Sequence, residues 1–303
     1  MNKQKLLLLV GPTAVGKTAL SIEIAQKFDL EVISGDSMQI YKHMDIGTGK
    51  ITEEEKDGIT HHMLDIVSPD QEYSVGEYQE AVHHLIDEKH NQNELPFIVG
   101  GTGLYIKSLI YENYTFNDEN QEEKDAKTAH YEQFKNAELY AMRESRIGNA
   151  IINIQPNNRR RVIRTLIRHD LGGLNNKKHF KNSLKYDIFI VGLRSKREDL
   201  YARINARVTS MMHNGLLEEV QHLHDNYQLS KTARAAIGYK EFDDYFKGHL
   251  VISDVETLIQ QRSRQYAKRQ LTFFRNQLPV NWYDLEWDNV ETIMEDIQQF
   301  INR

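Results

Sequence analysis

A glycine-containing loop near the start of the chain limits the possible fold more than any other feature. It reads GPTAVGKT from Gly11 to Thr18 and matches the pattern GxxxxGK[ST]. The apolar run Leu6–Val10 precedes the loop, and a helical pattern over residues 19–28 follows it. This is the context of strand, loop and helix that the motif requires. We therefore expect an α/β fold with a parallel sheet and the loop at the carboxyl end of a strand.

The same loop predicts a phosphorylated ligand. Its backbone amides, together with the N-terminus of the helix that follows, attract phosphate oxygens. The ammonium group of Lys17 would neutralise phosphate charge, and the hydroxyl of Thr18 is the expected protein ligand of a Mg²⁺ cofactor. The expected phosphate-binding residues of the loop are Gly11, Thr13, Ala14, Val15, Gly16, Lys17 and Thr18.

ATP hydrolysis does not follow from this loop. ATPases and kinases of the phosphate-loop class usually carry an aspartate at the end of a second strand, where it organises magnesium. The strand that we expect at residues 96–99 runs instead into Gly100–Gly103. This difference indicates that the diphosphate belongs to a molecule other than ATP.

Strand and helix patterns alternate in the first third of the chain and return near its C-terminus. Further strands are predicted at residues 31–34, 96–99, 186–193 and 282–285. Long helices are predicted at residues 75–89, 198–227 and 254–276. We predict an α/β core made of residues 1–114 and 186–303, with a helical insertion at 115–185 and a polar junction at 172–183.

Composition narrows the cellular setting. The chain has no cysteine, which excludes disulfides and cysteine-bound zinc. The apolar run Leu6–Val10 follows a basic start but is too short for a signal core or a membrane span. We expect a cytoplasmic protein without membrane attachment.

Positive charge is concentrated in two segments, although the formal net charge is −6. Residues 155–181 carry eight Lys or Arg and one acid, and residues 262–275 carry five Lys or Arg and no acid. Concentrated positive charge is typical of nucleic-acid binders. Each segment taken alone also fits a solvated helix face.

Six short segments follow the loop in a distinctive order. They are DSMQIY at 36–41, MDIGT at 44–48, HHMLDI at 61–66, GGTGLY at 100–105, AIGYKE at 236–241 and RQYAKRQ at 264–270. Together with the loop they make the chain resemble the bacterial tRNA dimethylallyltransferases, the adenosine isopentenyltransferase family. The resemblance covers residues 6–111 and 186–275. It implies a phosphate-loop NTPase-like parallel sheet core with an inserted α-helical domain.

The resemblance also implies a reaction and its partners. A dimethylallyl group would pass from dimethylallyl diphosphate to the exocyclic amine (N6) of the adenosine 3′-adjacent to the anticodon in tRNA, releasing diphosphate. The partners would be the tRNA anticodon stem-loop and dimethylallyl diphosphate, and we expect a monomer. The target base must leave its stack to reach a buried diphosphate.

Site residues follow from the resemblance and from position along the chain. Asp36 comes after a core strand, where open α/β sheets bind ligands, and the resemblance makes it the general base. The resemblance also places Arg207 on the diphosphate and Thr102 beside the flipped base. The expected catalytic residues are Asp36, Lys17, Thr18, Arg207 and Thr102. The expected tRNA-binding residues are Asp36, Ser37, Met38, Gln39, Thr102, Arg160, Arg161, Arg164, Gly238, Tyr239, Lys240, Arg264, Lys268, Arg269 and Arg275.

The segment around residues 264–275 has two helix faces. Arg264, Lys268 and Arg275 can share one face and hold loop phosphates. The other face carries Tyr266, Leu271 and Phe274, which we interpret as core packing. The histidine pairs at 61–62 and 83–84 are expected to be structural, because adjacent side chains on a helix or strand point apart.

Three other functions stay open at this point. A phosphate-loop kinase acting on a small molecule or nucleoside would explain the loop and Asp36, but not the two basic segments. A non-catalytic RNA-binding module would not need an intact Lys17 and Thr18. A related prenyltransferase acting on free adenine nucleotides would have no use for the basic insertion.

Overall fold

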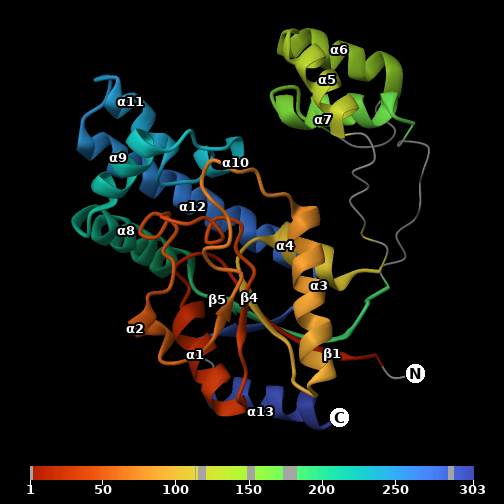
Figure 1. Ribbon diagram of the computed structural model, residues 1–303, viewed down its shortest axis with the longest axis vertical. Coiled ribbons are helices and arrows are strands. Elements are labelled where there is room, and N and C mark those ends of the chain that lie inside the picture. The colour runs from red at the N-terminus through yellow and green to blue at the C-terminus, as the bar shows by residue number, and fades with distance from the viewer. Residues whose placement is uncertain (1–2, 113, 115–120, 149–153, 173–182, 286–289) are drawn as a thin grey trace. The chain divides into compact units, whose positions relative to one another are not determined.

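The computed structural model divides the chain into two compact units. It describes residues 3–112, 114, 121–148, 154–172, 183–285 and 290–303 (Figure 1). The core unit comprises Met1–Tyr114 and Asn182–Arg303, and the insertion unit comprises Thr115–Lys181. The sequence interpretation placed the insertion at residues 115–185. The expected junction at 172–183 lies almost wholly outside the described residues.

The core unit contains a six-stranded sheet in which every described pairing is parallel. Its order is β3-β2-β4-β1-β5-β6, so the α/β class with a parallel sheet is confirmed. The strands are β1 Lys5–Val10, β2 Val32–Ser34, β3 His61–His62, β4 Phe97–Gly100, β5 Asp187–Arg194 and β6 Asn281–Asp284. The two-residue strand β3 was not expected, and it is too short to produce a sequence pattern.

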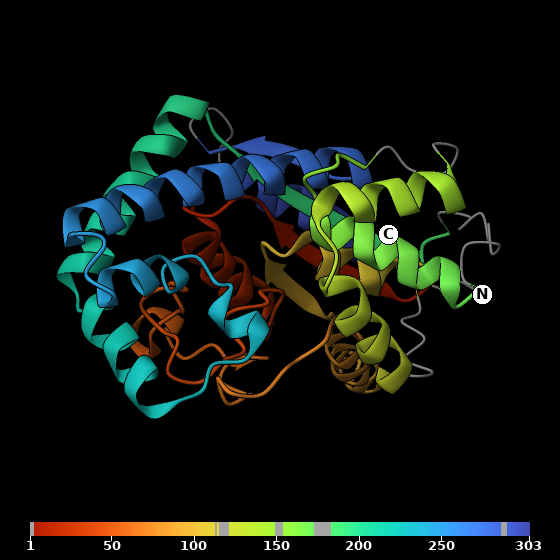
Figure 2. The same ribbon diagram turned by 90° about the horizontal axis from the view of Figure 1, so that it is seen from above.

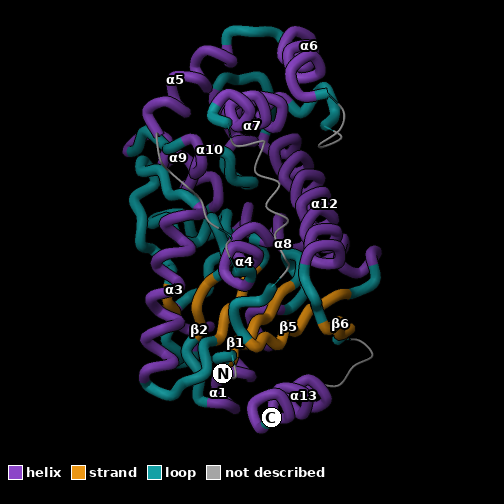
Figure 3. The backbone as a smooth tube through the Cα atoms, turned by 90° about the vertical axis from the view of Figure 1, so that its right-hand side faces the viewer, coloured by secondary structure: helices purple, strands orange, loops and turns teal. Residues whose placement is uncertain are grey.

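Strand β1 shows why these segments form the centre of the sheet. Its side chains from Leu6 to Val10 are fully buried, because alternate residues face two different hydrophobic clusters. Leu7 and Leu9 join the cluster on the side of helices α1 (Lys17–Phe28) and α13 (Val290–Asn302). Leu6 and Leu8 join the cluster on the side of helices α3 (Val75–Asn91) and α4 (Gly103–Ile110). Helix α13 packs against β5, and Figure 3 shows it beside the strands.

The other elements of the core unit are helices. They are α1 Lys17–Phe28, α2 Glu53–Lys56, α3 Val75–Asn91, α4 Gly103–Ile110, α8 Arg197–His213, α9 Leu216–Asn226, α10 Lys231–Arg234, the 3₁₀ helix η1 Lys240–Phe242, α11 Asp243–Phe246, α12 Ile252–Gln277 and α13 Val290–Asn302. Helix α12 is the long blue helix of Figure 2, and it packs against α8.

The single helix expected at residues 198–227 is wrong, because the structure has two. Helix α8 ends at His213 and α9 begins at Leu216, with Gly215 between them at a φ of +99°. A left-handed conformation of this kind favours glycine and stops the helix. The break lets Leu216 and Val220 of α9 pack with Ile40 and Met44 in a third hydrophobic cluster.

The described elements of the insertion unit are all helices. Its helices are α5 Gln121–Glu132, α6 Asn136–Ile147 and α7 Arg159–Asp170. They enclose a small core of their own, with Tyr131, Leu139, Val162 and Leu166 at its centre. The three helices of the insertion unit therefore pack around a hydrophobic cluster of their own.

None of the described helices is both long enough and apolar enough to cross a membrane.

Candidate active site

The phosphate loop lies between β1 and α1, as its sequence pattern requires. Gly16 is the N-cap of α1 and has a φ of +105°, a conformation that L side chains rarely adopt. No side chain caps this helix, so its first backbone amides keep their capacity to bind an anion. Val15 turns its side chain into the hydrophobic core, which leaves its backbone as the part available to a ligand.

Lys17 folds back onto the loop from which it comes. Its ammonium group donates hydrogen bonds to the carbonyls of Gly11 at 3.1 Å and Pro12 at 2.8 Å. Burial lowers the pKa of Lys17 to about 8; the charge of Asp36 acts in the opposite direction, and that of Arg207 lowers the pKa further. A bound phosphate would offer this half-buried cation a stronger acceptor than a carbonyl.

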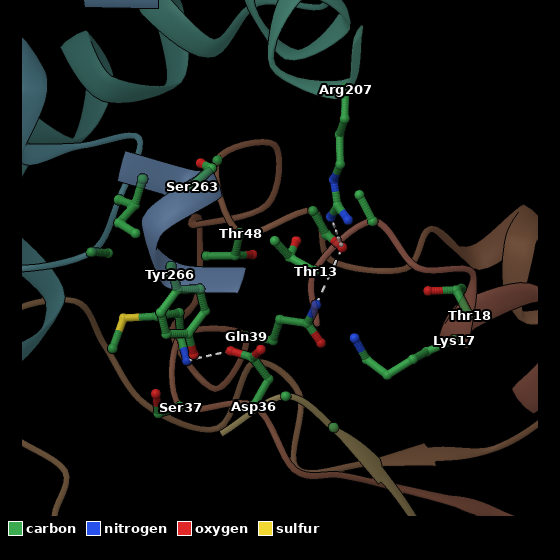
Figure 4. Close-up of a pocket in the computed structure, with 18 of the residues that line it drawn as sticks. Thr13, Lys17, Thr18, Asp36, Ser37, Gln39, Thr48, Arg207, Ser263 and Tyr266 are labelled. Atoms are coloured by element: carbon green, nitrogen blue, oxygen red, sulfur yellow. Dashed lines mark hydrogen bonds between the residues drawn. The ribbon is translucent and has the colours of Figure 1, made fainter. Parts of the chain in front are cut away.

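Arg207 reaches the same space from α8. Its guanidinium donates to the Gly49 carbonyl at 3.3 Å, and the Gln39 amide donates to the same oxygen at 3.2 Å. Burial lowers the pKa of Arg207, while Asp36 counteracts that effect. Figure 4 shows Arg207 and Lys17 extending toward the space that Asp36 also borders. Two half-buried cations at one end of a cavity form a suitable cradle for a diphosphate.

Asp36 and Thr102 lie near each other because they follow the neighbouring strands β2 and β4. One carboxylate oxygen of Asp36 accepts a hydrogen bond from the Met38 amide at 2.9 Å. The Thr102 hydroxyl accepts from the Ser37 amide at 3.0 Å and donates to the Ser37 hydroxyl at 3.2 Å. Gly100 allows this approach, since a side chain there would overlap the backbone that precedes Asp36.

Lys17, Arg207, Asp36 and Ser37 border a cavity of about 350 Å³; Thr102 is not among its lining residues and is hydrogen-bonded to Ser37, which is. This volume is in the range of small-molecule sites. The cavity brings together the expected site residues Thr13, Ala14, Lys17, Thr18, Asp36, Ser37, Met38, Gln39, Arg207, Lys240 and Arg269. Apolar side chains line another part of it, namely Ile204, Val208, Met211, Ile237 and Ile259. The cavity therefore offers positive charge to an anionic head and a hydrocarbon lining to an apolar tail.

The expected RNA-binding residues of α12 differ in exposure. Lys268, Arg269 and Arg275 are exposed, whereas Arg264 is half-buried and donates to the side-chain carbonyl of Asn205. The guanidinium of Arg269 lies 5.6 Å from the centre of the Tyr266 ring. In the insertion unit, Arg160, Arg161 and Arg164 are all exposed on α7.

The segment Gly238–Lys240 is positioned differently. The Gly238 amide donates to the buried carboxylate of Glu241 at 2.8 Å, and Lys240 donates to the Ala235 carbonyl at 3.2 Å. Tyr239 is only 3% exposed, and its hydroxyl donates to Glu219 at 2.7 Å. A contact between Tyr239 and RNA stays a prediction, and the structure gives this side chain a role inside the protein.

Glu219 is a site residue that the sequence did not suggest. Its carboxylate accepts hydrogen bonds from the amides of Asp45 at 2.9 Å, Ile46 at 2.7 Å and Gly47 at 3.0 Å, in addition to the Tyr239 hydroxyl. Both oxygens are therefore in use. We call this arrangement the Glu219 clamp, and it holds the loop that ends at the Gly49 carbonyl beside Arg207 and Gln39.

Tyr266 and Gln270 on α12 were also missed as site residues. Both line the cavity, so the expectation that Tyr266 belongs only to the core is incomplete. Leu271 and Phe274 do pack in the hydrophobic clusters. Burial and the charge of Asp36 raise the pKa of Tyr266, which keeps its hydroxyl neutral. The spacing of four between Tyr266 and Gln270 was the available signal, because it places them on one helix face.

A magnesium ion fits the chemistry of this site only together with a phosphate ligand. Among the described residues no group of three or more His, Asp or Glu side chains is placed to hold a metal. Mg²⁺ usually binds through one or two protein oxygens, phosphate oxygens and water. The hydroxyl of Thr18 borders the cavity and can supply such an oxygen.

The paired histidines have separate partners. His61 contacts the Ile59 carbonyl at 2.9 Å, His62 contacts Glu31 at 2.6 Å, and His83 contacts the Tyr186 hydroxyl at 3.0 Å. These contacts agree with the structural roles that we expected of these three rings.

This chain is similar to several known proteins. A model of the IPP transferase family matches residues 39–277. The tRNA dimethylallyltransferase of Macrococcus caseolyticus is 43% identical over 100% of this chain and 98% of its own length. The tRNA dimethylallyltransferase of Bacillus subtilis is 46% identical over 94% of this chain and 92% of its own length.

Solved structures give the same result. A tRNA isopentenylpyrophosphate transferase from Staphylococcus epidermidis superposes with a TM-score of 0.73 at 40% identity, covering 99% of both chains. A eukaryotic dimethylallyltransferase acting on tRNA superposes with a TM-score of 0.79 at 28% identity, covering 99% of this chain and 80% of the other.

Proposed function

Because the chain belongs to the IPP transferase family, we propose that it is a tRNA dimethylallyltransferase. It transfers the dimethylallyl group of dimethylallyl diphosphate to the N6 amine of the adenosine 3′-adjacent to the anticodon. The observation that carries the proposal is the shared cavity. There the phosphate loop, Lys17 and Arg207 lie at the cationic end, and Asp36 borders the same space.

The reaction exchanges one bond for another. The N6 amine attacks the allylic carbon, the bond from that carbon to the diphosphate oxygen breaks, and the diphosphate leaves with the electron pair. Lys17, Arg207 and the loop amides stabilise the charge that develops on the leaving group. The apolar lining holds the hydrocarbon part. A Mg²⁺ ion bound to the diphosphate and to Thr18 would further neutralise that charge.

Asp36 is the base for this amine. The lone pair of N6 is delocalised into the adenine ring, so the amine needs a group that removes its proton as the new bond forms. Asp36 borders the cavity, and the Met38 amide orients its carboxylate. Ser37 and Gln39 border the same cavity, and Thr102 is hydrogen-bonded to Ser37. These three side chains would bind the edge of a flipped base.

Exposed positive charge holds the RNA, and one of these cations, Arg269, also borders the cavity. Lys268, Arg269 and Arg275 expose cations on α12, and Arg161 and Arg164 do so on α7. Phosphate contacts of this kind position a stem-loop without reading its sequence. We further propose that the protein acts as a monomer in the cytoplasm, where it would meet its tRNA substrate.

A kinase is the less favoured function. Strand β4 ends at Gly100 and continues into the loop of Thr102, rather than into a magnesium-binding aspartate. The relatives named above are also transferases that act on tRNA.

The test is a transfer assay with the full-length protein. Labelled dimethylallyl diphosphate is incubated with an anticodon stem-loop that carries an adenosine next to the anticodon, with and without Mg²⁺. We expect label in the RNA, confined to the N6 position by mass spectrometry of the nucleosides. Phosphate transfer from ATP to a nucleoside, with no prenylated RNA, would overturn the proposal.

A further inference from the structure

Gln270 is a buried polar residue that contacts two loops at once. It lies on α12 and is 5% exposed. Its side-chain carbonyl accepts a hydrogen bond from the Thr13 amide at 3.0 Å, and its amide donates to the Gly101 carbonyl at 2.9 Å. Thr13 belongs to the phosphate loop and Gly101 precedes Thr102. One side chain therefore connects the diphosphate end of the cavity to the base end.

The surrounding face of α12 reinforces this connection. Tyr266, Gln270 and Phe273 are spaced by four and three residues, so they form one stripe along the helix. Tyr266 and Gln270 both line the cavity, as does Gly101. A side chain at Gly101 would overlap Gln270, and one at Gly103 would overlap the Phe273 ring. The loop 101–103 thus lies directly against the helix.

The two loops that Gln270 joins carry the two halves of the reaction. The phosphate loop fixes the diphosphate and hence its allylic carbon, whereas the loop of Thr102 borders the position of the adenine. Both hydrogen bonds of Gln270 end on backbone atoms, so they act on the position of each loop and not on a substrate. Reaction rates depend steeply on such alignment, and a misplacement of about 1 Å can cost roughly 100-fold.

We propose that Gln270 is a positioning residue that sets the phosphate loop at the correct distance from the Thr102 loop, and so aligns the allylic carbon with the N6 amine. The inference rests on the proposed function. A residue that only stabilised the fold would affect folding and both substrate affinities, whereas a positioning residue affects turnover of substrates that are already bound.

The first experiment replaces Gln270→Met, which keeps the length of the side chain but removes both hydrogen bonds. The matched control is Gln261→Met, the same change at an exposed position of the same helix. For each protein we measure kcat, the melting temperature, and the Kd of inorganic diphosphate and of an anticodon stem-loop separately. We expect kcat of Gln270→Met to fall by about 10- to 100-fold, with both Kd values within about 3-fold of wild type. The control should match wild type.

A second variant reaches the same contact from the loop. Gly101→Ala places a methyl group against the Gln270 amide and leaves Gln270 in the sequence. We expect the same selective loss of kcat. In the double variant the combined loss should be smaller than the product of the single losses, because both changes break one contact.

Several results would overturn the inference. The inference fails if kcat of Gln270→Met, or of a folded Gly101→Ala, stays within about 2-fold of wild type. It also fails if the losses multiply in the double variant, or if a loss of kcat is matched by an equal loss of either affinity. If wild type itself fails to prenylate the stem-loop, it is the proposed function that fails, and this result is distinct from all of these.

Discussion

At the residue scale, the site depends on two cations, Lys17 and Arg207, that donate hydrogen bonds to backbone carbonyls. Lys17 and Arg207 are both half-buried, and the bonds described above give them only carbonyl acceptors. Burying a cation without a counter-ion is unfavourable, and burial lowers the pKa of both groups as a result. An anionic ligand removes this cost, so the free energy of binding is largest for a ligand with several negative charges.

The lowered pKa of Lys17 predicts how diphosphate affinity changes with pH. Lys17 is charged below its pKa of about 8, so affinity should be highest there and fall as the pH rises through that value. At pH 9 about one tenth of the free protein would keep this proton, and binding would then require proton uptake. Titrating inorganic diphosphate calorimetrically between pH 7 and 9.5 measures this change.

The control for this prediction is Lys17→Arg. A guanidinium stays charged throughout this range, so its affinity should vary much less with pH, whatever its absolute value. Parallel pH profiles for wild type and Lys17→Arg would assign the titration to another group.

A second prediction at this scale concerns Asp36. In Asp36→Asn the side-chain carbonyl can still accept the hydrogen bond from Met38, so the loop should keep its shape. The base is lost, and turnover should fall by roughly 10²-fold or more, with tRNA affinity nearly unchanged. Single-turnover kinetics and a binding titration measure the two quantities. Near-normal turnover of Asp36→Asn would remove Asp36 from the mechanism.

The sequence predicted those site residues whose side chains would themselves meet the substrate. Lys17, Thr18 and Asp36 belong to short motifs with a known chemical reason, and all three line the cavity. Glu219 and Gln270 could not be predicted in the same way, because their partners are backbone atoms of distant loops. Only the folded arrangement shows which carbonyl or amide a side chain reaches.

At the scale of elements, the break between α8 and α9 determines the shape of the site. A continuous helix would carry Glu219 away from the loop 45–47. With Gly215 in a left-handed conformation, α9 turns and Glu219 reaches three amides of that loop. The break was missed because the hydrophobic pattern continues across residues 213–216, and one glycine within a helical pattern is tolerated.

The Glu219 clamp leads to a prediction about substrate binding. In Glu219→Gln one of the two acceptor oxygens becomes an NH₂ group that faces N–H or O–H donors. The loop should loosen, and the Gly49 carbonyl should no longer orient Arg207. We expect the KM for dimethylallyl diphosphate to rise by roughly 10-fold, about 1.4 kcal/mol. Steady-state kinetics at saturating stem-loop RNA measure it.

Glu218→Gln is the matched control for the clamp. It removes the same charge from the same helix, but Glu218 is exposed. Tyr239→Phe removes only one of the four donors and should have an intermediate effect. Equal KM values for Glu219→Gln and Glu218→Gln would show that the clamp does not govern diphosphate binding.

The strands were easier to predict from the sequence than the break between α8 and α9. The runs at β1, β4 and β5 are buried on both faces of a parallel sheet, so they appear in the sequence as continuous apolar segments. Strand β3 has two histidines that are half-buried, and it exists only because β2 is its neighbour.

At the scale of the whole molecule, the positive charge is distributed over both units. The core unit exposes Lys268 and Arg269, and the insertion unit exposes Arg161 and Arg164, in a protein whose formal net charge is −6. Each unit has its own hydrophobic core, so a surface substitution in one should leave the fold of the other unchanged.

Charge reversal tests whether both clusters bind tRNA. The double variants Arg161→Glu with Arg164→Glu, and Lys268→Glu with Arg269→Glu, should each weaken tRNA binding and leave the Kd of diphosphate unchanged. Losing one phosphate contact should flatten the slope of log affinity against log salt by about 0.7 to 0.9. Binding titrations across a salt series measure it, and an unchanged affinity and slope would identify that cluster as a solvated face.

The core unit is assembled from both ends of the chain, whereas the insertion unit is one continuous segment. The sequence indicated this organisation because strand patterns stop near residue 114 and return near 186. It did not indicate the packing of α12 against the Thr102 loop, which joins residues more than 160 positions apart.

The hydrogen bonds of Lys17 to carbonyls of its own loop have a consequence after the chemical step. Once the prenyl group has left, the free diphosphate still carries every oxygen that Lys17, Arg207 and the loop amides can bind. Its departure returns Lys17 to the weaker carbonyls of Gly11 and Pro12. The protein therefore holds its by-product through the same contacts as its donor, and inorganic diphosphate should compete with dimethylallyl diphosphate. In a cell, continued turnover would then depend on an independent hydrolysis that removes diphosphate, so the rate of tRNA modification would respond to phosphate metabolism as well as to the supply of prenyl donor.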